Sequence, residues 1–372
     1  MANTGTVIPD GLNLRETPGG TVKIVLPKGK TVEILEDQGD FLKVTAMGKT
    51  GFVKASLIDR SGAGAGAEAA DGEAAAGGGF HFEGNKAVAP DGTVFGKKFK
   101  FGIFNSGKTS IADFVGAHPG SFPNLSPSRL RVMSAVSVNE GKLEAINTWD
   151  SAFLTFGCFQ WTVGGGNAAG ELPAMVNRLK QTDPAVFNQL LGQFGLEIAS
   201  VSNPPGQTPT GFFSLNGAVL KSAADKGAKL RTLEMAFRFF RAGHDDTMRA
   251  VEVEYAASRI DLFYRDANHR IKNLFIADFV TSEFGVALIL DEHVNRPAHV
   301  PGTIGAAVNQ FIAATGKNDP TTWTDQDEAK LLNIYIQRRS TSGMTDSDDR
   351  ATRVRQAVNN GLASDKRGSF QP

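Results

Sequence analysis

Residues 138–161 read VNEGKLEAINTWDSAFLTFGCFQW, and this stretch decides which fold the second half of the chain can adopt. A helical pattern over residues 128–139 ends at Glu140, because Gly141 can take the left-handed conformation that stops helices. The following residues, rich in Thr, Trp, Phe and Gly, predict a β-hairpin that folds back past the helix end. This geometry can place one carboxyl group, that of Glu140, at an apolar helix terminus and another, that of Asp150, on the facing hairpin.

Two carboxyl groups in unlike surroundings suit glycoside hydrolysis. The reaction needs a carboxylic acid that stays protonated to donate to the leaving oxygen, and often a second carboxylate that positions water. Glu140, among Val, Leu, Phe and Trp, is expected to have a raised pKa, whereas Asp150, beside Asn147 and Thr148, is expected to stay ionised. The pattern therefore predicts Glu140 as general acid and Asp150 as the water-positioning group, with Glu144 as the fallback acid.

The order of these residues carries a family resemblance. Glu140, Gly141-Lys142, Asn147-x-Trp149-Asp150 and Phe156-Gly157-x-x-Gln160 resemble the active-site segment of goose-type lysozymes and soluble lytic transglycosylases. The resemblance implies that Glu140 is the general acid, that Asp150 orients water, and that the segment around Gln160 lines a sugar cleft. Residues 240–245 and 287–296 resemble helices of the wider lysozyme and chitosanase superfamily more weakly. The substrate-binding residues expected on this basis are Asn147, Trp149, Gln160 and Trp161.

A linker divides the chain before this segment. Residues 61–79, SGAGAGAEAADGEAAAGGG, contain no side chain large enough to anchor a core, so they are expected to be flexible. The predicted organisation is a domain over residues 1–60, the Gly/Ala linker over 61–79, and a second domain over 80–372. Helical patterns dominate from about residue 127 onwards, and one of them predicts a helix over residues 271–292.

The first domain shows short alternating runs separated by turn signals, a pattern that predicts a small all-β barrel. It resembles the bacterial SH3-like family at residues 12–15, at Thr17-Pro18, at the Lys28-Gly29 turn and at residues 51–53. That family usually binds cell-wall peptidoglycan, which makes Phe41 and Phe52 candidate platform aromatics. Both could equally be core residues of so small a barrel. The predicted fold class is therefore multi-domain, an SH3-like barrel followed by a mainly α-helical lysozyme-like domain with a short β-hairpin.

A second motif predicts a different class of protein. Residues 102–109, GIFNSGKT, satisfy G-x-x-x-x-G-K-[ST], and residues 287–292 satisfy the apolar-run-plus-acid pattern of P-loop ATPases. A phosphate-binding loop needs a buried strand before it and a substantial helix after it. Residues 97–101 alternate Lys and Phe, and only residues 110–117 can be helical before His118-Pro119-Gly120. We therefore favour a structural turn at this loop.

The composition excludes several further classes. Lys plus Arg and Asp plus Glu both number 39, so the chain has no net positive charge that would favour binding to nucleic acid. Cys158 is the single cysteine and no histidines fall at H-x-x-x-H spacing, so we expect no disulfide, no metal site and no cofactor. No run of about 18 apolar residues predicts a membrane span. The N-terminus lacks the pattern of a Sec signal, so we expect synthesis in the cytoplasm and release by phage or contractile-injection delivery machinery.

These observations favour a peptidoglycan hydrolase that cleaves the β-1,4 glycosidic bond of glycan strands, an N-acetylmuramidase of the endolysin or secreted antimicrobial effector kind, acting on the cell wall or in the periplasm. The alternatives are a lytic transglycosylase, a P-loop ATPase, and a non-catalytic structural protein with a lysozyme fold.

Overall fold

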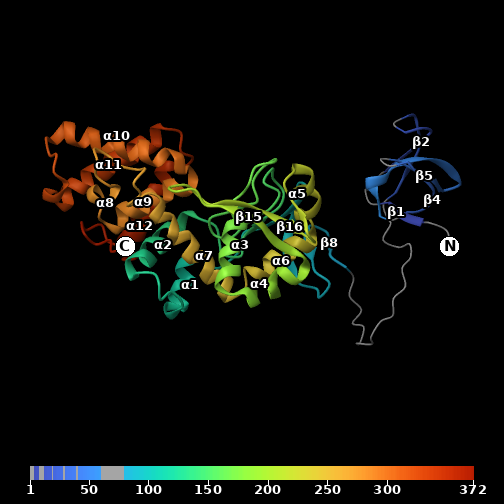
Figure 1. The fold of residues 1–372 in the computed structure, drawn as a ribbon, viewed down its shortest axis with the longest axis horizontal. Coiled ribbons are helices and arrows are strands. Elements are labelled where there is room, and N and C mark those ends of the chain that lie inside the picture. The colour runs from blue at the N-terminus through green and yellow to red at the C-terminus, as the bar shows by residue number, and fades with distance from the viewer. Residues whose placement is uncertain (1–3, 8–11, 19, 28–29, 39–40, 60–78) are drawn as a thin grey trace. The chain divides into compact units, whose positions relative to one another are not determined.

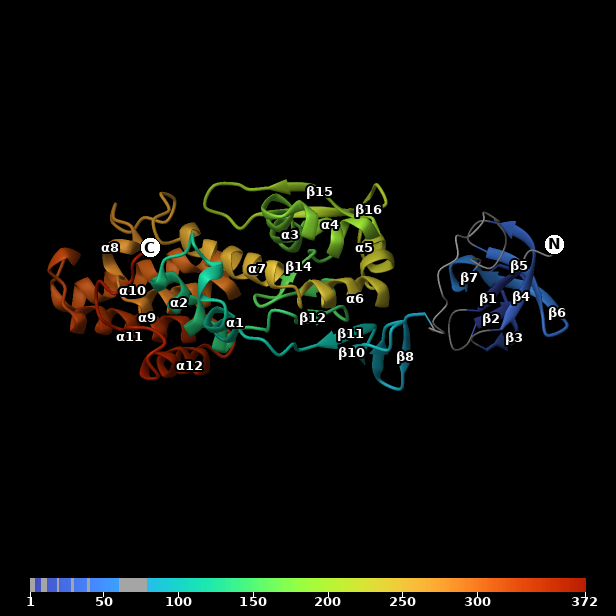
Figure 2. The ribbon, with the colours of Figure 1, turned by 90° about the horizontal axis from the view of Figure 1, so that it is seen from below.

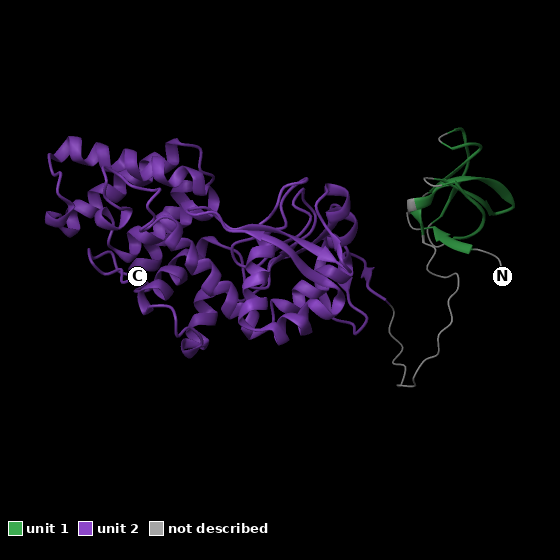
Figure 3. Cartoon of the chain, in the orientation of Figure 1, with its two compact units in different colours: residues 1–75 green, residues 76–372 purple. Residues whose placement is uncertain are grey.

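The computed structural model describes residues 4–7, 12–18, 20–27, 30–38, 41–59 and 79–372 of the chain. The chain separates into two compact units, residues 1–75 and 76–372 (Figure 3). The predicted linker over residues 61–79 lies outside the described residues except for Gly79, and so does the predicted Lys28-Gly29 turn. Each unit has its own hydrophobic core, and the two cores share no residue.

The first unit is all-β, as the alternating pattern predicts. Its strands form one antiparallel sheet in the order β3-β2-β6-β5-β4-β1-β7. Along β5, Leu42, Val44 and Ala46 are buried while the residues between them are half-buried, so one face of the strand forms the core. The strands are β1 (Thr4–Val7), β2 (Leu12–Arg15), β3 (Val22–Leu26), β4 (Thr31–Gln38), β5 (Phe41–Ala46), β6 (Lys49–Lys54) and β7 (Ile58–Asp59).

The second unit opens with another antiparallel sheet, which contains the hairpin predicted after Glu140. Ile146 pairs with Phe156 and Asn147 with Thr155, so the predicted hairpin is confirmed as β12–β13. The sheet order is β14-β13-β12-β11-β10-β9-β8. Its strands are β8 (His81–Glu83), β9 (Lys86–Val88), β10 (Val94–Phe99), β11 (Gly102–Asn105), β12 (Ile146–Asn147), β13 (Thr155–Phe156) and β14 (Trp161–Thr162).

Helices form the remainder of the second unit together with a small third sheet. Helices α8 to α12 gather with α2 at one end of this unit, the sheets and α3 to α6 lie at the other, and α7 runs between them (Figures 1 and 2). The helices are α1 (Ile111–Ala117), α2 (Pro127–Val136), α3 (Leu172–Thr182), α4 (Pro184–Leu190), α5 (Ala223–Leu230), α6 (Leu233–Ala242), α7 (Asp246–Ser258), α8 (Ile276–Phe279), α9 (Glu283–Asn295), α10 (Val300–Thr315), α11 (Asp325–Thr341) and α12 (Ser347–Asn359).

Two parts of the second unit differ from the sequence prediction. The third sheet, β15 (Leu196–Ser202), β16 (Thr210–Leu215) and β17 (Ala218–Val219), was not expected in a region of helical patterns. The predicted helix over residues 271–292 is wrong. It is interrupted because Lys272 and Asn273 take positive φ angles of 49° and 68°, and because Ser282 caps a new helix by accepting the Gly285 N–H at 3.0 Å.

Helix α9 is the central element of the helical end. Every residue from Glu283 to His293 is buried, including the charged residues Asp291 and Glu292. A helix that is buried on all faces must pair its charged side chains with its neighbours. Within the described part of the chain, no helix is long and apolar enough to cross a membrane.

Separate cores predict separate folding. A chain truncated to residues 79–372 should unfold at the same urea midpoint as the second unit of the full chain. All three tryptophans, Trp149, Trp161 and Trp323, lie in the second unit, so tryptophan fluorescence reports on that unit alone in both proteins. A clearly lower midpoint after truncation would show that the first unit stabilises the second.

Candidate active site

Glu140 lies where the sequence predicts it, at the end of a helix and against the hairpin. Helix α2 continues into the 3-10 helix η3 (Ser137–Asn139), and Glu140 is its C-cap with extended backbone. The Gly141 N–H donates to the Cys158 carbonyl at 2.7 Å, which joins the helix end to the hairpin. A Cβ atom on Gly141 would lie 2.6 Å from Gln160 Nε2. The Cys158 carbonyl would lie 3.1 Å from the same Cβ atom, so a larger residue would fit tightly here and displace the Gln160 side chain. The predicted left-handed stop is wrong, because φ of Gly141 is not positive.

The Glu140 carboxyl group is almost completely buried, with 7% of its side chain exposed. It accepts a hydrogen bond from the guanidinium group of Arg350, on α12. Burial raises the pKa of Glu140 to about 7, because desolvation outweighs the opposing charge of Arg350, and the nearby carboxylate of Asp291 adds to the rise. A carboxyl group in this state can hold a proton at neutral pH, as the sequence predicts.

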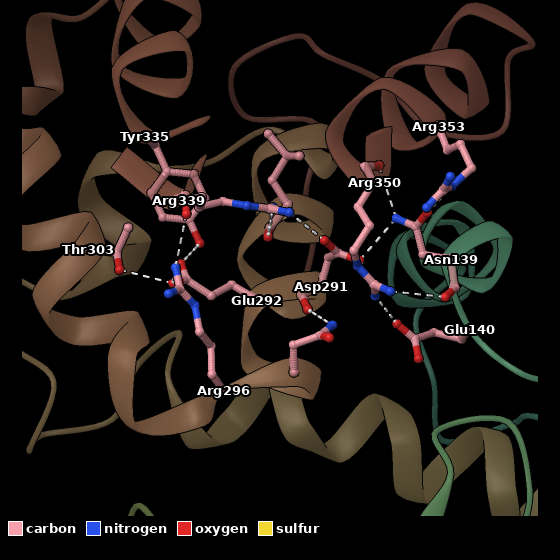
Figure 4. Close-up of polar contacts among 12 residues, drawn as sticks. Asn139, Glu140, Asp291, Glu292, Arg296, Thr303, Tyr335, Arg339, Arg350 and Arg353 are labelled. Atoms are coloured by element: carbon pink, nitrogen blue, oxygen red, sulfur yellow. Dashed lines mark hydrogen bonds and ion pairs between the residues drawn. The ribbon is translucent and has the colours of Figure 1, made fainter. Parts of the chain in front are cut away.

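Arg350 is held by a buried carboxylate (Figure 4). The Nε and Nη2 atoms of Arg350 donate to Asp291 Oδ1 at 3.0 and 2.7 Å. The other oxygen, Oδ2, accepts from Arg339 Nη2 at 2.6 Å, and both side chains of that pair are fully buried. Asn139, the residue before Glu140, donates to Asp291 Oδ1 at 3.0 Å. The position of Glu140 is therefore determined by α9, α11 and α12 together.

A second buried carboxyl group fixes the hairpin from the opposite direction. Glu252, on α7, accepts the Cys158 N–H at 3.1 Å, and it is completely buried. A Cβ atom on Gly157 would lie 2.4 Å from Glu252 Oε2, and Gly157 has a φ of +79°, so glycine is required there. Burial raises the pKa of Glu252 well above its usual range, and that of the Cys158 thiol likewise. Cys158 thus serves packing and backbone hydrogen bonding, not nucleophilic chemistry.

Asp150 lies in the connection between β12 and β13. Its Oδ1 accepts the Ala152 N–H at 2.9 Å and its Oδ2 accepts from Asn147 Nδ2 at 2.8 Å, while Asn147 Oδ1 accepts the Trp149 N–H at 3.0 Å. Asp150 and Asn147 therefore order the hairpin turn. Among the described residues, no hydrogen bond or ion pair joins Asp150 to Glu140, which approaches the hairpin at Cys158. Glu140 therefore lies at the helix end beside Cys158, and Asp150 lies in the turn of the hairpin.

The three remaining residues predicted to bind substrate have different surroundings. Gln160 is exposed beside Gly141, with its side chain donating to the Gly157 carbonyl at 2.9 Å. Trp149 is half-buried and packs edge-on against Phe99 at 5.0 Å. Trp161 is only 1% exposed and packs against Tyr255 and Phe159, so it belongs to the core and not to an accessible surface.

Sequence reasoning missed the aromatic residues beside Trp149. The β10–β11 turn presents Phe99 and Phe101, and Phe101 is 76% exposed. The Lys100 ammonium lies 4.2 Å from the centre of the Trp149 ring, and the Arg231 guanidinium lies 5.8 Å from that of Phe101. The signal was present in the alternation of Phe and Lys over residues 97–101, which we used only as evidence of a half-exposed strand.

The loop over residues 102–109 binds the carboxyl group of Glu144, which belongs to the same chain. The N–H groups of Lys108 and Thr109 donate to Glu144 Oε1 at 2.9 and 3.1 Å, and the Thr109 hydroxyl also donates to it, at 3.1 Å. Glu144 is buried, so it occupies the positions that a phosphate would need. The other half of the P-loop pattern, Asp291-Glu292, lies within α9. The arrangement gives no support to an ATPase, and Glu144 is engaged in holding the loop.

Phe41 and Phe52 lie in the first unit and line one surface pocket of about 350 Å³. Both rings are half-buried, and neither belongs to the buried core of the barrel. Asn13, Arg15 and Lys54 line the same pocket, so its wall combines aromatic and cationic groups. Of the two possibilities left open by the sequence, this placement favours a surface role.

No group of three or more His, Cys, Asp or Glu side chains that could hold a metal ion occurs in the described part of the chain. Residues 10–59 match the bacterial SH3 domain family, whose members bind cell-wall peptidoglycan, so the first unit contains such a domain. No curated protein matches the chain, and no solved structure does.

The raised pKa of Glu140 predicts how stability depends on pH. The folded protein keeps this proton up to about pH 7, whereas the unfolded chain releases it near pH 4.5, so the free energy of unfolding should fall between these values. The expected loss is about 3 kcal/mol. Glu140→Gln cannot ionise, so the variant should match the wild type at pH 4 and be more stable at pH 8. Urea unfolding followed by tryptophan fluorescence measures both, and equal stabilities at pH 8 would contradict the assigned burial.

Proposed function

We propose that the protein is a peptidoglycan hydrolase that cleaves the β-1,4 glycosidic bond of glycan strands, with Glu140 as the general acid. The observation that carries the proposal is the Glu140 carboxyl group, buried at a helix end against a β-hairpin, with a pKa raised to about 7. General acids work best when their pKa lies near the operating pH, because they are then protonated and still able to donate. The bacterial SH3 domain at residues 10–59 supplies the expected wall-binding module.

Arg350 interacts with Glu140 both before and after the proposed proton transfer. Before transfer, burial keeps Glu140 protonated despite the neighbouring guanidinium. After transfer, the new carboxylate forms a charge-assisted hydrogen bond with Arg350, whose orientation Asp291 already fixes. The arginine therefore stabilises the product state of the acid without reorganisation, which is the form of electrostatic stabilisation that catalysis favours.

The hairpin supplies the groups proposed to meet the glycan. Gln160 is exposed beside the helix end that carries Glu140, and Trp149 with Phe99 offers aromatic surface further along the sheet. Asp150 is the carboxylate proposed to position the attacking water. Because the turn holds both oxygens of Asp150 by one hydrogen bond each, its orientation is fixed while further lone pairs stay free to accept from water.

The first unit supports the same proposal for an insoluble polymer. A binding module on the same chain raises the local concentration of cleavable bonds around the catalytic unit. The pocket with Phe41, Phe52, Arg15 and Lys54 is the surface proposed for wall contact, since its aromatic rings suit sugars or peptide and its cations suit carboxylates. The proposed site of action is accordingly the cell wall.

One observation favours a lytic transglycosylase as the second candidate. Asp150 contributes its two oxygens to the turn, and no described contact links it to Glu140. A transglycosylase needs no carboxylate for water, because the 6-hydroxyl of the sugar attacks and leaves a 1,6-anhydro end. Both outcomes use Glu140 as the acid, so the products distinguish them.

Removal of the acid should abolish cleavage. Glu140→Gln keeps the size of the side chain but cannot donate the proton, so peptidoglycan clearing should fall at least about 100-fold while binding to insoluble walls is retained. In the wild type, kcat/KM should decline above about pH 7 as Glu140 ionises. Glu234→Gln, on the exposed side of α6 where Glu234 pairs with Arg238, is the matched control and should clear walls normally. Near-full clearing by Glu140→Gln would show that a group other than Glu140 supplies the proton, and an absence of clearing by the wild type would contradict the hydrolase.

The second carboxylate decides the reaction type. If Asp150 positions water, Asp150→Asn should lose about 100-fold or more in rate, and digested peptidoglycan should carry reducing ends. Mass spectrometry of the fragments measures this directly, because anhydro ends are lighter by one water. A majority of anhydro ends, with little effect of Asp150→Asn, would identify a transglycosylase instead.

A further inference from the structure

The turn between β10 and β11 presents phenylalanine and lysine side chains to solvent. Residues 97–101 read Lys-Lys-Phe-Lys-Phe, all five are exposed, and we call this segment the Lys/Phe tip. The exposed phenylalanines of the described chain lie on β8, on this tip and on β11; they are Phe82, Phe99, Phe101 and Phe104. The other described phenylalanines are buried or half-buried, so the exposed rings are concentrated on one part of the second unit.

The geometry of the turn does not account for the residues that form it. Lys100 and Phe101 are the two residues between the strands, and Lys100 has a φ of +46°. Turns of this kind favour Asn or Gly, because larger side chains are strained at positive φ. Phe101 is 76% exposed, so the hydrophobic core does not hold its ring either. Binding to a partner explains these two side chains better than folding of the hairpin does.

The tip continues into apolar surface on the outer face of the sheet. Phe104 is the cross-strand partner of Lys97, and Phe99 lies two residues further along β10, so the three side chains share one face. Phe99 is 46% exposed and Phe104 is 43% exposed. Rings and cations therefore stand together on this face, and removing the rings from water would be favourable.

The three lysines of the tip form no ion pair with any described residue. The acidic residues of the adjoining β8–β10 segment have other neighbours. Glu83 Oε1 lies 3.3 Å from His81 Nε2, and Asp91 Oδ1 accepts the Thr93 N–H at 2.9 Å. The chain as a whole is neutral, so the positive charge of the tip is a local feature. A partner that covers the tip should therefore carry negative charge.

The ring faces distinguish between two kinds of anionic partner. Single-stranded nucleic acid binds exposed aromatic residues by stacking its bases on free ring faces. The Lys100 ammonium lies 5.7 Å from the centre of the Phe99 ring, and the Arg231 guanidinium lies 5.8 Å from that of Phe101. Cations thus already occupy a face of both rings of the tip, which disfavours base stacking.

A phospholipid surface matches both the charge and the apolar rings of the tip. Lysine stems lie along apolar surface while their ammonium groups reach lipid phosphates, and aromatic rings enter the boundary between headgroups and acyl chains. The tip carries both kinds of side chain within five residues. A protruding turn can enter a bilayer without a matching pocket, whereas a protein partner would need a pocket for Phe101.

We propose that the Lys/Phe tip binds the surface of an anionic phospholipid bilayer, with Phe101 entering the headgroup boundary and the lysines contacting lipid phosphates. This binding does not depend on the proposed hydrolase activity, because it involves neither Glu140 nor a glycan. It gives the chain a second localising surface, separate from the pocket of the first unit. Phe99 also belongs to the surface proposed to meet the glycan, so the tests leave Phe99 unchanged.

The test uses the full chain and co-sedimentation with vesicles of equal parts phosphatidylglycerol and phosphatidylcholine. The wild type should bind these vesicles at least about tenfold more tightly than vesicles of phosphatidylcholine alone, which offer the lysines no net negative charge. Phe101→Ser should weaken binding at least about fivefold, because the ring no longer leaves water. Leu362→Ser, at an exposed position just after α12, is the control and should bind as the wild type does. Equal affinity of Phe101→Ser and the wild type overturns the proposal.

A double variant tests the charge separately. Lys97→Gln combined with Lys98→Gln should weaken binding to the mixed vesicles at least about tenfold. Lys272→Gln combined with Lys330→Gln removes two exposed lysines elsewhere in the second unit, and this matched control should leave binding unchanged. Equal weakening by the two double variants would mean that the position of the lysines does not matter, and the proposal would be wrong.

Other occupants of the tip give different results. Failure of the wild type to bind either kind of vesicle overturns the proposal, and so does vesicle binding that neither tip variant weakens. Binding of oligothymidylate in place of the vesicles would identify a nucleic-acid surface, and a dimer that Phe101→Ser dissociates would identify a second copy of the chain. Urea unfolding followed by tryptophan fluorescence checks that each variant is folded. Glu140→Gln should bind vesicles as the wild type does, so the proposed hydrolase and the lipid surface stand or fall separately.

Discussion

The second unit depends on the buried carboxylate of Asp291, held between the guanidinium groups of Arg339 and Arg350. Removing these charges from water is costly, and the cost is offset only where every charge is paired and hydrogen-bonded. Here α9, α11 and α12 supply the partners, and Arg350 passes the constraint on to Glu140. With Glu140 ionised the two carboxylates balance the two guanidiniums, so Arg350 restrains the rise in pKa that burial causes. The network is better explained by fixing the position of the Glu140 carboxyl group than by stability, since buried ion pairs seldom stabilise more than apolar packing would.

The hairpin is held to this network by close backbone contacts at two glycines, tight at Gly141 and sterically excluded for larger residues at Gly157. Gly141 approaches Cys158 and Gln160, and Gly157 approaches Glu252, so two glycines allow the helix end, the hairpin and α7 to meet. Cores of this density transmit small displacements, because no free volume absorbs them. A substitution at either glycine would therefore move Glu140 relative to the hairpin without touching its carboxyl group.

The sequence predicts those parts of this arrangement whose pattern lies within adjacent residues, and it does not predict the contacts between distant residues. The helix end at Glu140 and the β12–β13 hairpin were predictable, because both depend on patterns within adjacent residues. The partners of Glu140 were not, since Asp291, Arg339 and Arg350 are distant in sequence and nothing in their local patterns specifies pairing. Trp161 shows the same limit. The composition of a hairpin indicates a strand, but which face of that strand packs against Tyr255 is decided by helix α7.

The carboxyl groups of Glu140 and Glu171 are both buried and each pairs with an arginine, but they lie at opposite ends of their helices. Burial raises the pKa of both carboxyl groups. Glu140 follows the C-terminal end of α2 and η3, where the helix dipole is negative and disfavours an ionised carboxylate. Glu171 is the N-cap residue of α3, where the positive end of the dipole favours the ionised form. The dipole thus adds to the effect of burial at Glu140 and opposes it at Glu171. The dipole therefore favours the protonated form of the Glu140 carboxyl group and the ionised form of the Glu171 carboxyl group.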